Sequence, residues 1–241
     1  MANPYRREAL PLAPYDHEGE EWDFNEFPIQ PRKKLDEDDK ALAASLSKSQ
    51  GTDPFVPTTK SERILAQLIE ADEDLAKKVG YGVKRSLKWA KEFEKAEKAN
   101  NLPKGSLVAV SAIESSGQPE IVGPKTRYGH AKGLMQFIPA TAKEMGLKVS
   151  DEAGGLDERL DPAKAIEAGG KYLGSLVKAS DGDLFQALMM YNWGPGNVQK
   201  WKENEKRMMP RETRMYLGKW IAAMKYQSEA AAKPTTSATQ P

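Results

Sequence analysis

From Ser61 onwards, apolar side chains recur at the three- and four-residue spacing of a helix, and glycines and prolines separate these runs. Ser61 is suited to cap the first helix, and the pattern predicts a break in it at residues 80–82. A second helix is expected over residues 83–99, and few runs show the alternation of a strand. The spacing therefore predicts a mainly α-helical protein.

Later helices are expected where a capping residue or a proline precedes an apolar run. One has Pro103 in its first turn and leads to Glu114. The others are expected over residues 139–146, 162–177, 184–191 and 210–226. Gly169 and Gly170 should let a neighbouring helix approach closely, because they have no side chain.

Two segments of the helical region contain residues that favour turns. Residues 117–132 hold three glycines and two prolines, which predicts a loop with room for a small β-hairpin. Residues 151–161 are acidic and contain glycine, and a second loop is expected there.

Residues 1–60 differ from the rest of the chain, because they are rich in proline and in acidic groups. Such a segment buries too little apolar surface to offset its ordering entropy, which predicts a flexible leader. An alternating set of apolar residues within it is typical of a segment that folds onto a partner: Trp22, Phe24, Phe27 and Ile29. The leader is therefore either a spacer or a docking segment, with a short helix expected over residues 36–47.

The opposite end, residues 227–241, has low complexity and is expected to be a disordered tail. Residues 61–100 are interpreted as two accessory helices that precede the main domain, which we expect over residues 101–226.

Charge and cysteine content exclude several classes of partner and site. A net charge of +1 gives no bulk attraction to nucleic acid or to an anionic membrane. The absence of cysteine excludes disulfides and thiolate metal sites, and His17 and His130 are isolated, so no metal ion or other cofactor is expected. The N-terminus lacks an apolar signal core and no run reaches about 18 apolar residues, so neither a signal peptide nor a membrane span is predicted.

The apolar run over residues 108–113 ends at a single carboxylate, Glu114. Burial against apolar neighbours disfavours the charged form of a carboxyl group, so the pKa of Glu114 should rise. A glutamic acid that stays protonated near neutral pH can protonate a sugar oxygen as that oxygen leaves. If only this run and Glu114 are considered, the alternative to a catalytic role is a solvated glutamate at the end of an amphipathic helix.

Four short motifs beginning at Glu114 decide between these interpretations. They are the pair Glu114-Ser115, the sequence GLMQ at 133–136, YNWGPG at 191–196 and ETRMY at 212–216. With these motifs in this order, residues 92–220 resemble the catalytic domain of the soluble lytic transglycosylases, bacterial and phage enzymes that cleave peptidoglycan strands. The resemblance implies a lysozyme-like helical domain over residues 101–226.

The chain departs from the family pattern at one edge of the expected cleft. Gly123 stands where the family typically has a serine, and the loop before GLMQ is a few residues longer.

The resemblance also implies the chemistry. Most glycosidases use two carboxylates, but these motifs supply one. The acidic residues that follow are interpreted as helix caps or surface charges: Glu120, Glu144, Asp151, Glu152, Asp157, Glu158 and Asp161. In the family, the N-acetyl group and then the 6-hydroxyl of muramic acid replace the second carboxylate and the water. Glu114 is then the catalytic acid and base, and the product carries a 1,6-anhydro end.

The other motif residues are expected to bind or orient substrate. The Tyr191 hydroxyl is expected to hydrogen-bond the Glu114 carboxyl, and Ser115 to do similar orienting work. The amides of Gln136 and Asn192 are suited to N-acetyl and carbonyl groups.

Apolar contacts to the sugar faces are expected from Met135 and Tyr216, and Gly133 belongs to the same expected substrate-binding set. Core packing is the alternative for several apolar residues of the motifs: Met135, Phe137, Met189, Met190 and Trp193. Glu212 and Arg214 are expected either to pair locally or to line the cleft.

Residues 146–183 look especially like the transglycosylase domains of internal virion proteins of short-tailed phages. The leading hypothesis is therefore a virion-associated lytic transglycosylase that cleaves the β-1,4 bond between N-acetylmuramic acid and N-acetylglucosamine in the host periplasm during genome ejection. Its partners would be glycan strands and, through the leader, other virion or machine proteins. The alternatives are a virion structural or peptidoglycan-binding component without turnover, and a transglycosylase of conjugation, secretion or lysis.

Overall fold

The computed structural model describes residue 69 and residues 72–150, 155–203 and 209–232. Four expected features lie outside these ranges: the leader, its short helix, the cap at Ser61 and the Asp151-Glu152 part of the acidic loop.

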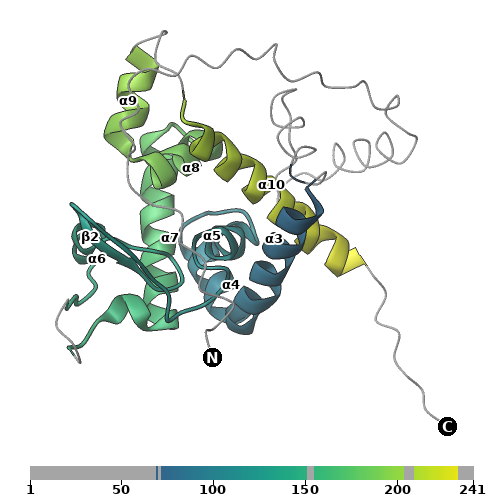
Figure 1. Cartoon of the computed structure of the whole chain (residues 1–241), viewed down its shortest axis with the longest axis horizontal. Helices are drawn as coiled ribbons and strands as arrows, with labels where there is room; N and C mark the ends of the chain where they lie inside the picture. The colour runs from purple at the N-terminus through teal and green to yellow at the C-terminus, as the bar shows by residue number, and fades with distance from the viewer. Residues whose placement is uncertain (1–68, 70–71, 151–154, 204–208, 233–241) are drawn as a thin grey trace, which may run out of the picture.

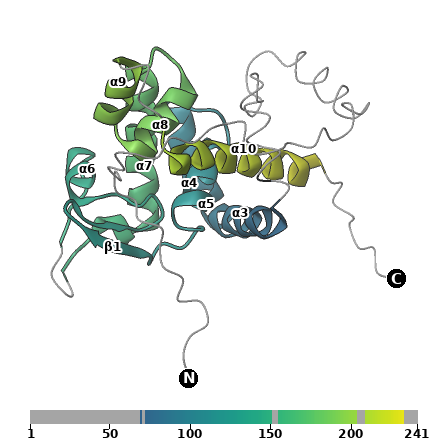
Figure 2. The same ribbon diagram turned by 45° about the horizontal axis from the view of Figure 1, so that its top comes forward.

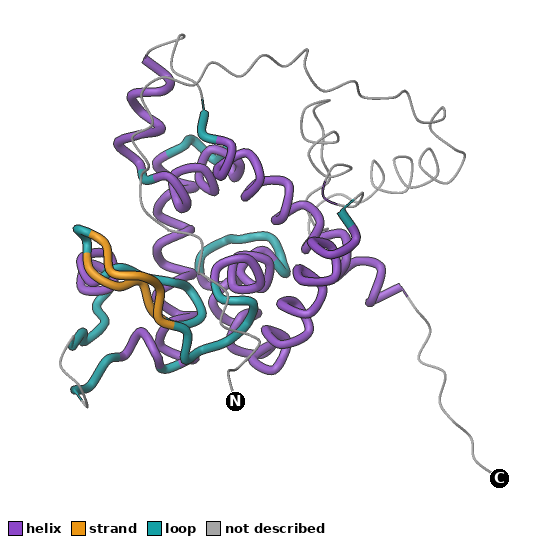
Figure 3. Tube along the Cα trace, viewed as in Figure 1, coloured by secondary structure: helices purple, strands orange, loops and turns teal. Residues whose placement is uncertain are grey.

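The described chain is mainly helical and contains one antiparallel β-hairpin, as expected (Figures 1 and 3). Its helices are α3 (Glu73–Ser86), α4 (Ala90–Ala99), α5 (Ser106–Glu114), α6 (Pro139–Glu144), α7 (Pro162–Ala179), α8 (Leu184–Trp193), α9 (Pro195–Glu203) and α10 (Arg211–Ala232). Two 3-10 turns, η1 (Leu87–Trp89) and η2 (Glu158–Leu160), and the strands β1 (Val122–Thr126) and β2 (Gly129–Lys132) complete it. None of these helices is long and apolar enough to cross a bilayer.

Helix α5 is the centre of the fold, with α3, α4, α7 and α10 packed around it (Figure 1). Every residue from Ser106 to Ala112 is buried, as expected for a helix that is apolar on all sides. The buried carboxylate of Glu97 accepts hydrogen bonds from the backbone N–H groups of Gly105 and Leu107, each at 2.8 Å. A carboxylate there stabilises the helix N-terminus, so α5 is fixed at its start and carries Glu114 at its end.

The predicted helix break at residues 80–82 is wrong, because α3 continues through both glycines. A Cβ atom on Gly82 would lie 2.6 Å from the carbonyl oxygen of Ala112, and one on Gly80 would lie 3.0 Å from the Tyr226 ring. These glycines let α5 and α10 approach α3 closely. The helix changes at η1 instead, which leaves Leu87 exposed.

Three other boundaries differ from expectation. Helix α5 begins after Gly105, which has a φ of +84°, so Pro103 precedes the helix. Helix α9 was not predicted, although Pro195 occupies its first position. The tail expected from residue 227 is wrong for residues 227–232, because α10 extends to Ala232 and Gln227 Nε2 donates to Gly105 O at 3.0 Å.

Other local predictions are confirmed. Gly146, with a φ of +89°, follows the last turn of α6. The Asp161 side chain caps α7 by accepting from the backbone N–H of Lys164 at 3.1 Å. A Cβ atom on Gly170 would lie 3.1 Å from the Ala96 side chain, so α4 does approach α7 at this glycine.

The hairpin and α6 lie beside α7, on its left in Figure 1, whereas α8 and α9 lie near its upper end in that view (Figures 1 and 2). Strands β1 and β2 pair with Thr126 opposite Gly129, and Arg127 and Tyr128 form the turn between them. This arrangement leaves room for a cleft beside the C-terminal end of α5.

Candidate active site

A cleft of about 240 Å³ lies at the C-terminal end of α5. Its lining comes from α5, from the hairpin turn, from α6 and the segment before it, from α7 and α8, and from the start of α9. The lining residues are Glu114, Tyr128, Gln136, Phe137, Ile138, Thr141, Tyr172, Tyr191, Asn192, Trp193, Gly194, Pro195 and Asn197. Among these described residues, Glu114 is the only carboxylate, and none has a cationic side chain.

The Oε2 atom of the Glu114 carboxyl is buried and has no hydrogen-bond partner in the described part of the chain. Burial raises the pKa of Glu114 to about 8. The neighbouring Tyr216 hydroxyl and the Lys219 ammonium lower this pKa, whereas the charge of Glu212 raises it. Glu114 is therefore protonated at neutral pH, in the direction that its apolar surroundings predicted.

Tyr216 adjoins this carboxyl from α10 and does not line the cleft, contrary to the expected role as a sugar-contacting surface. Its side chain is 3% exposed, and its hydroxyl has no hydrogen-bond partner among the described residues. Burial and the charge of Glu114 raise the pKa of Tyr216 well above its usual value, so the hydroxyl remains neutral.

Tyr191 lines the cleft, but the predicted hydrogen bond from its hydroxyl to Glu114 is wrong. The hydroxyl donates instead to the backbone carbonyl of Met135 at 2.9 Å. Burial first, and then the charge of Glu114, raise the pKa of Tyr191 well above its usual value. Tyr191 therefore holds the chain at Met135 and presents its ring to the cleft.

Ser115 and Gln136 also bind backbone carbonyls. Ser115 Oγ lies 3.0 Å from both Leu134 O and Ser111 O, so its hydroxyl donates to a backbone carbonyl and not to Glu114. Gln136 lines the cleft, but its Nε2 donates to Gly133 O at 2.9 Å. Both side chains fix the GLMQ segment, and only Gln136 also faces the ligand space.

Met135 and Gly133 do not line the cleft. Met135 is fully buried against Gly169 of α7, so its expected sugar contact is replaced by core packing. Gly133 has a φ of +78° and packs directly against the carbonyl of Arg159, where no side chain fits.

Asn192 is the motif residue best placed for a ligand amide. It lines the cleft, and its Oδ1 accepts a hydrogen bond from Thr213 Oγ1 at 2.9 Å. This bond orients the side chain and leaves the amide N–H groups as donors. Thr213 is buried and belongs to the ETRMY motif, but no role was predicted for it from the sequence.

Three aromatic rings form one wall of the cleft. Tyr172 packs edge-on against Phe137 with ring centroids 5.8 Å apart and lies 5.2 Å from the ring of Tyr191. Burial raises the pKa of Tyr172 to about 12, so its hydroxyl is neutral. Such rings present apolar faces suited to sugar C–H groups. Tyr172 lies in α7, outside all four motifs.

Met189 and Met190 are buried and do not line the cleft, in agreement with the packing interpretation, whereas Phe137 and Trp193 are buried and also line the cleft. The lining residues that the sequence did not indicate all lie outside the four motifs: Tyr128, Ile138, Thr141, Tyr172 and Asn197.

No second carboxylate faces Glu114 across the cleft among the described residues. Asp157 and Glu158 were expected as caps or surface charges; the cap is confirmed for Asp157, whereas Glu158 is buried and is not a surface charge. Asp157 caps η2 and pairs with Arg159, whereas Glu158 pairs with Lys164 and accepts from the Lys148 N–H. Within the described ranges, no group of three or more potential metal-binding side chains occurs.

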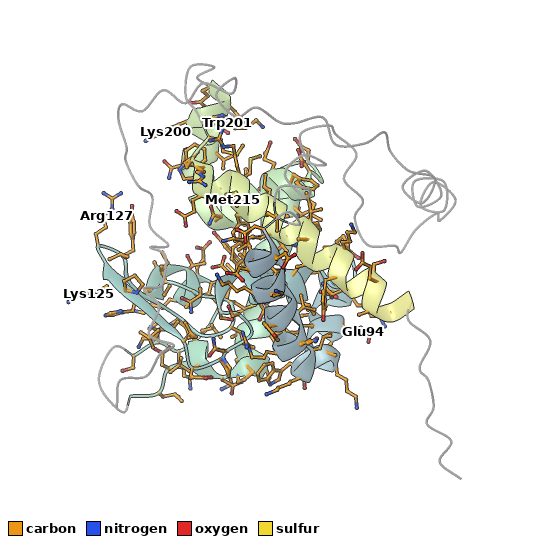
Figure 4. All side chains as sticks on the ribbon, turned by 45° about the vertical axis from the view of Figure 1, so that its right-hand side comes forward. Glu94, Lys125, Arg127, Lys200, Trp201 and Met215 are labelled. Atoms are coloured by element: carbon orange, nitrogen blue, oxygen red, sulfur yellow. The ribbon has the colours of Figure 1, made fainter. Side chains whose placement is uncertain are left out.

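Cationic and aromatic side chains lie on the hairpin and on α9, two elements that contribute residues to the cleft. Figure 4 shows Lys125 and Arg127 at the hairpin and Lys200 and Trp201 on α9. The Arg127 guanidinium lies over the ring of Tyr128 at 4.7 Å from its centroid, beside the cleft.

Comparison with known proteins agrees with this geometry. The transglycosylase SLT domain family matches residues 91–213, just over half of the chain. The chain is 42% identical over 106 residues to the peptidoglycan transglycosylase gp16 of Escherichia phage T7, which covers 44% of this chain and 8% of that protein. It is 31% identical over 135 residues to the membrane-bound lytic murein transglycosylase D of Escherichia coli K12, covering 52% of this chain and 28% of the relative.

The fold is also shared with a solved structure, the complex of the 70-kDa soluble lytic transglycosylase with bulgecin A. The match has a TM-score of 0.51 at 21% identity and covers 81% of this chain and 33% of the other. The chain thus spans less than a third of the length of either sequence relative. By the extent of the family match, this chain belongs to the transglycosylase SLT domain family.

Proposed function

We propose that this protein is a lytic transglycosylase that cleaves the β-1,4 bond between N-acetylmuramic acid and N-acetylglucosamine in peptidoglycan. The observation that carries the proposal is Glu114, a buried carboxyl with a pKa of about 8 and the only carboxylate among the described residues that line the cleft. A single group of this kind can serve as acid and then as base in one reaction cycle.

In the first step, the Glu114 carboxyl protonates the glycosidic oxygen as the bond from that oxygen to muramic acid C1 breaks. The carbonyl oxygen of the neighbouring N-acetyl group bonds to C1 and takes the place of a second carboxylate. In the second step, the Glu114 carboxylate removes the proton from the 6-hydroxyl, O6 bonds to C1, and the N-acetyl oxygen leaves. The product is a 1,6-anhydro end, and no water is consumed.

Other cleft groups support these steps. The free N–H donors of Asn192 are suited to an N-acetyl carbonyl, and the rings of Tyr172 and Tyr191 are suited to sugar faces. The Tyr216 hydroxyl adjoins Glu114 and is neutral, so it is available to hydrogen-bond the carboxylate formed after proton transfer.

We propose further that the enzyme is carried in a phage virion and acts on the host cell wall, with residues 1–60 docking onto other virion proteins. Two observations support this context. The sequence is similar to a phage peptidoglycan transglycosylase, and residues 146–183 resemble the transglycosylase domains of internal virion proteins of short-tailed phages. A chain that starts at Ser61 is expected to release glycan fragments but to be missing from particles. Normal copy number of this shortened chain in particles would contradict docking.

Product analysis tests the enzymatic proposal. Sacculi digested with the purified full chain are expected to give muropeptides that end in 1,6-anhydro-muramic acid when analysed by mass spectrometry. Reducing ends would indicate a hydrolase instead. Binding to sacculi without any released fragment would indicate a peptidoglycan-binding component without turnover.

A further inference from the structure

Side chains from other parts of the chain donate hydrogen bonds to several backbone carbonyls of one segment at the cleft. This segment, residues 130–137, is called the floor loop here, and its last two residues, Gln136 and Phe137, line the cleft. Ser115 binds the carbonyl of residue 134 and Tyr191 binds that of residue 135. Buried carbonyls outside regular structure need such donors.

The two ends of the floor loop are joined by one residue that lies outside all four motifs. Arg159 of η2 is completely buried, and its Nη1 donates to His130 O at 2.7 Å and to Phe137 O at 3.3 Å. The Lys132 N–H also donates to Phe137 O, at 3.2 Å, which closes the loop. A single guanidinium thus fixes the start and the end of the segment.

The same guanidinium is paired with a buried acid. Arg159 Nε and Nη2 donate to the two Asp157 oxygens at 2.8 and 2.7 Å, and Lys132 Nζ of the floor loop reaches Asp157 at 2.9 Å. The Asp157 side chain is 4% exposed. The planar fork of arginine makes such two-sided contacts, whereas a lysine ammonium cannot reproduce them.

The backbone contact between the loop and η2 is equally close. Gly133 packs against the Arg159 carbonyl, and a side chain at this position would overlap that atom. The floor loop is therefore seated on η2 by its backbone as well as by the Arg159 side chain.

The pairing of Arg159 with Asp157 affects the cleft as well as stability. A buried ion pair is weak evidence for stabilisation, because desolvation offsets much of the attraction. Here the pair serves to aim donors at two carbonyls of a segment that lines the cleft. We propose that Arg159 is a positioning residue for glycan binding, which acts through the floor loop to place Gln136 and Phe137 without touching the substrate. The inference rests on the proposed function for its ligand.

Two variants in the full chain test this role. Arg159→Lys keeps the charge but lacks the fork, and Arg159→Met removes both. The matched control is Glu158→Gln, because Glu158 is a neighbouring buried acid of η2 whose bonds go to Lys148 and Lys164 and not to the floor loop. If Arg159→Met does not fold, Arg159→Lys and Lys132→Met decide the question.

The first readout is the Kd of a soluble tetrasaccharide of alternating N-acetylglucosamine and N-acetylmuramic acid, measured in the Glu114→Gln background. The second is KM, kcat and the pH profile, measured with Glu114 intact. Displaced positioning groups cost on the order of ten- to a hundredfold, so Kd and KM should rise by about that factor in the Arg159 variants. The control should stay within about twofold, and the high-pH limit of activity should not move, because Arg159 does not face Glu114.

Folded Arg159 variants with unchanged Kd and KM would overturn the proposal, as would an equal loss in the Glu158→Gln control. Binding in the Glu114→Gln background does not require turnover. An absence of anhydro products from the wild-type chain would therefore reject the proposed function, while the binding comparison would still decide the role of Arg159.

Discussion

Glu114 and Asp157 are both buried carboxyl groups near the same cleft, and their pKa values move in opposite directions. Glu114 Oε2 has no hydrogen-bond partner among the described residues, and burial raises its pKa to about 8. Burial also acts to raise the pKa of Asp157, but hydrogen bonds from Arg159 and Lys132 outweigh it and lower that pKa. Hydrogen bonds from cationic side chains thus offset burial at Asp157, and Glu114 has no such bonds among the described residues.

Glu97 is the intermediate case. Its carboxyl accepts backbone N–H groups at the start of α5, yet burial still dominates and raises its pKa to about 7. Neutral donors therefore compensate for burial less than the cationic partners of Asp157 do. The fold thus places a carboxyl group with a raised pKa at each end of α5, and only Glu97 accepts backbone N–H groups of the helix start.

The largest expected effect is on turnover. Glu114→Gln keeps the shape of the side chain but can neither give nor take a proton, so the rate should fall by at least about 10²- to 10⁴-fold. The release of soluble fragments from sacculi measures this rate, and sacculus pull-down provides the binding control. Activity above about a tenth of wild type would remove Glu114 from its catalytic role.

The second prediction tests the paired carboxyl. Asp157→Asn leaves the Arg159 guanidinium buried without a counter-charge, and breaking one side of a buried pair costs about 3 to 5 kcal/mol. Because the folded pKa of Asp157 is lowered, its stabilisation is present above the ordinary pKa of 3.8 and is lost as the pH falls through the folded value. Urea unfolding should show a deficit at pH 7 that shrinks toward pH 3.

The third prediction concerns Glu114, whose pKa shifts in the opposite direction to that of Asp157. Its folded pKa is raised, so its contribution to stability is fully present below pH 4.5 and is lost as the pH rises toward about 8. Glu114→Gln does not titrate and should become more stable than wild type by about 1 to 3 kcal/mol at pH 8.5. Equal stability of the two proteins at pH 5 and at pH 8.5 would show that Glu114 is not desolvated.

Tyr191→Phe should have a smaller effect. It removes the donor to Met135 O, a hydrogen bond with a net value of about 1 kcal/mol, while the ring stays in the cleft wall. We expect a loss of at most about tenfold in kcat/KM, with the high-pH limit unchanged. A shift of that limit would mean that the hydroxyl acts on Glu114 directly.

The smallest predicted effect concerns the charges on α10. Lys219 lowers the pKa of Glu114 and Glu212 raises it, so Lys219→Met should move the high-pH limit of activity upward and Glu212→Gln should move it downward. The two variants are controls for each other. Shifts in the same direction would contradict the electrostatic account of this site.

The sequence predicted the parts of this molecule that depend on local pattern. The helical class, the hairpin, the Asp161 cap and the rise in the Glu114 pKa all follow from residues adjacent in the chain. The break at Gly80 was predicted wrongly because local propensity for glycine ignores a packed partner, here the ring of Tyr226.

The rest of the site depends on contacts between distant segments. Tyr191 finds its acceptor 56 residues away at Met135, and nothing in either motif indicates that pairing. Arg159 is a charged residue that composition places at the surface, whereas the fold buries it to join the two ends of the floor loop. Such roles become visible only when the segments are packed together.

The most direct test of the account is the titration of the Glu114 carboxyl in the full chain. With selectively ¹³C-labelled glutamate, the carboxyl signal that disappears in Glu114→Gln identifies this residue, and its chemical shift is followed across the pH range. The account predicts a midpoint near pH 8, so that the group is protonated at neutral pH. A midpoint near the ordinary value of 4.5 would mean that Glu114 is ionised when substrate arrives, and the proposed acid step would be wrong.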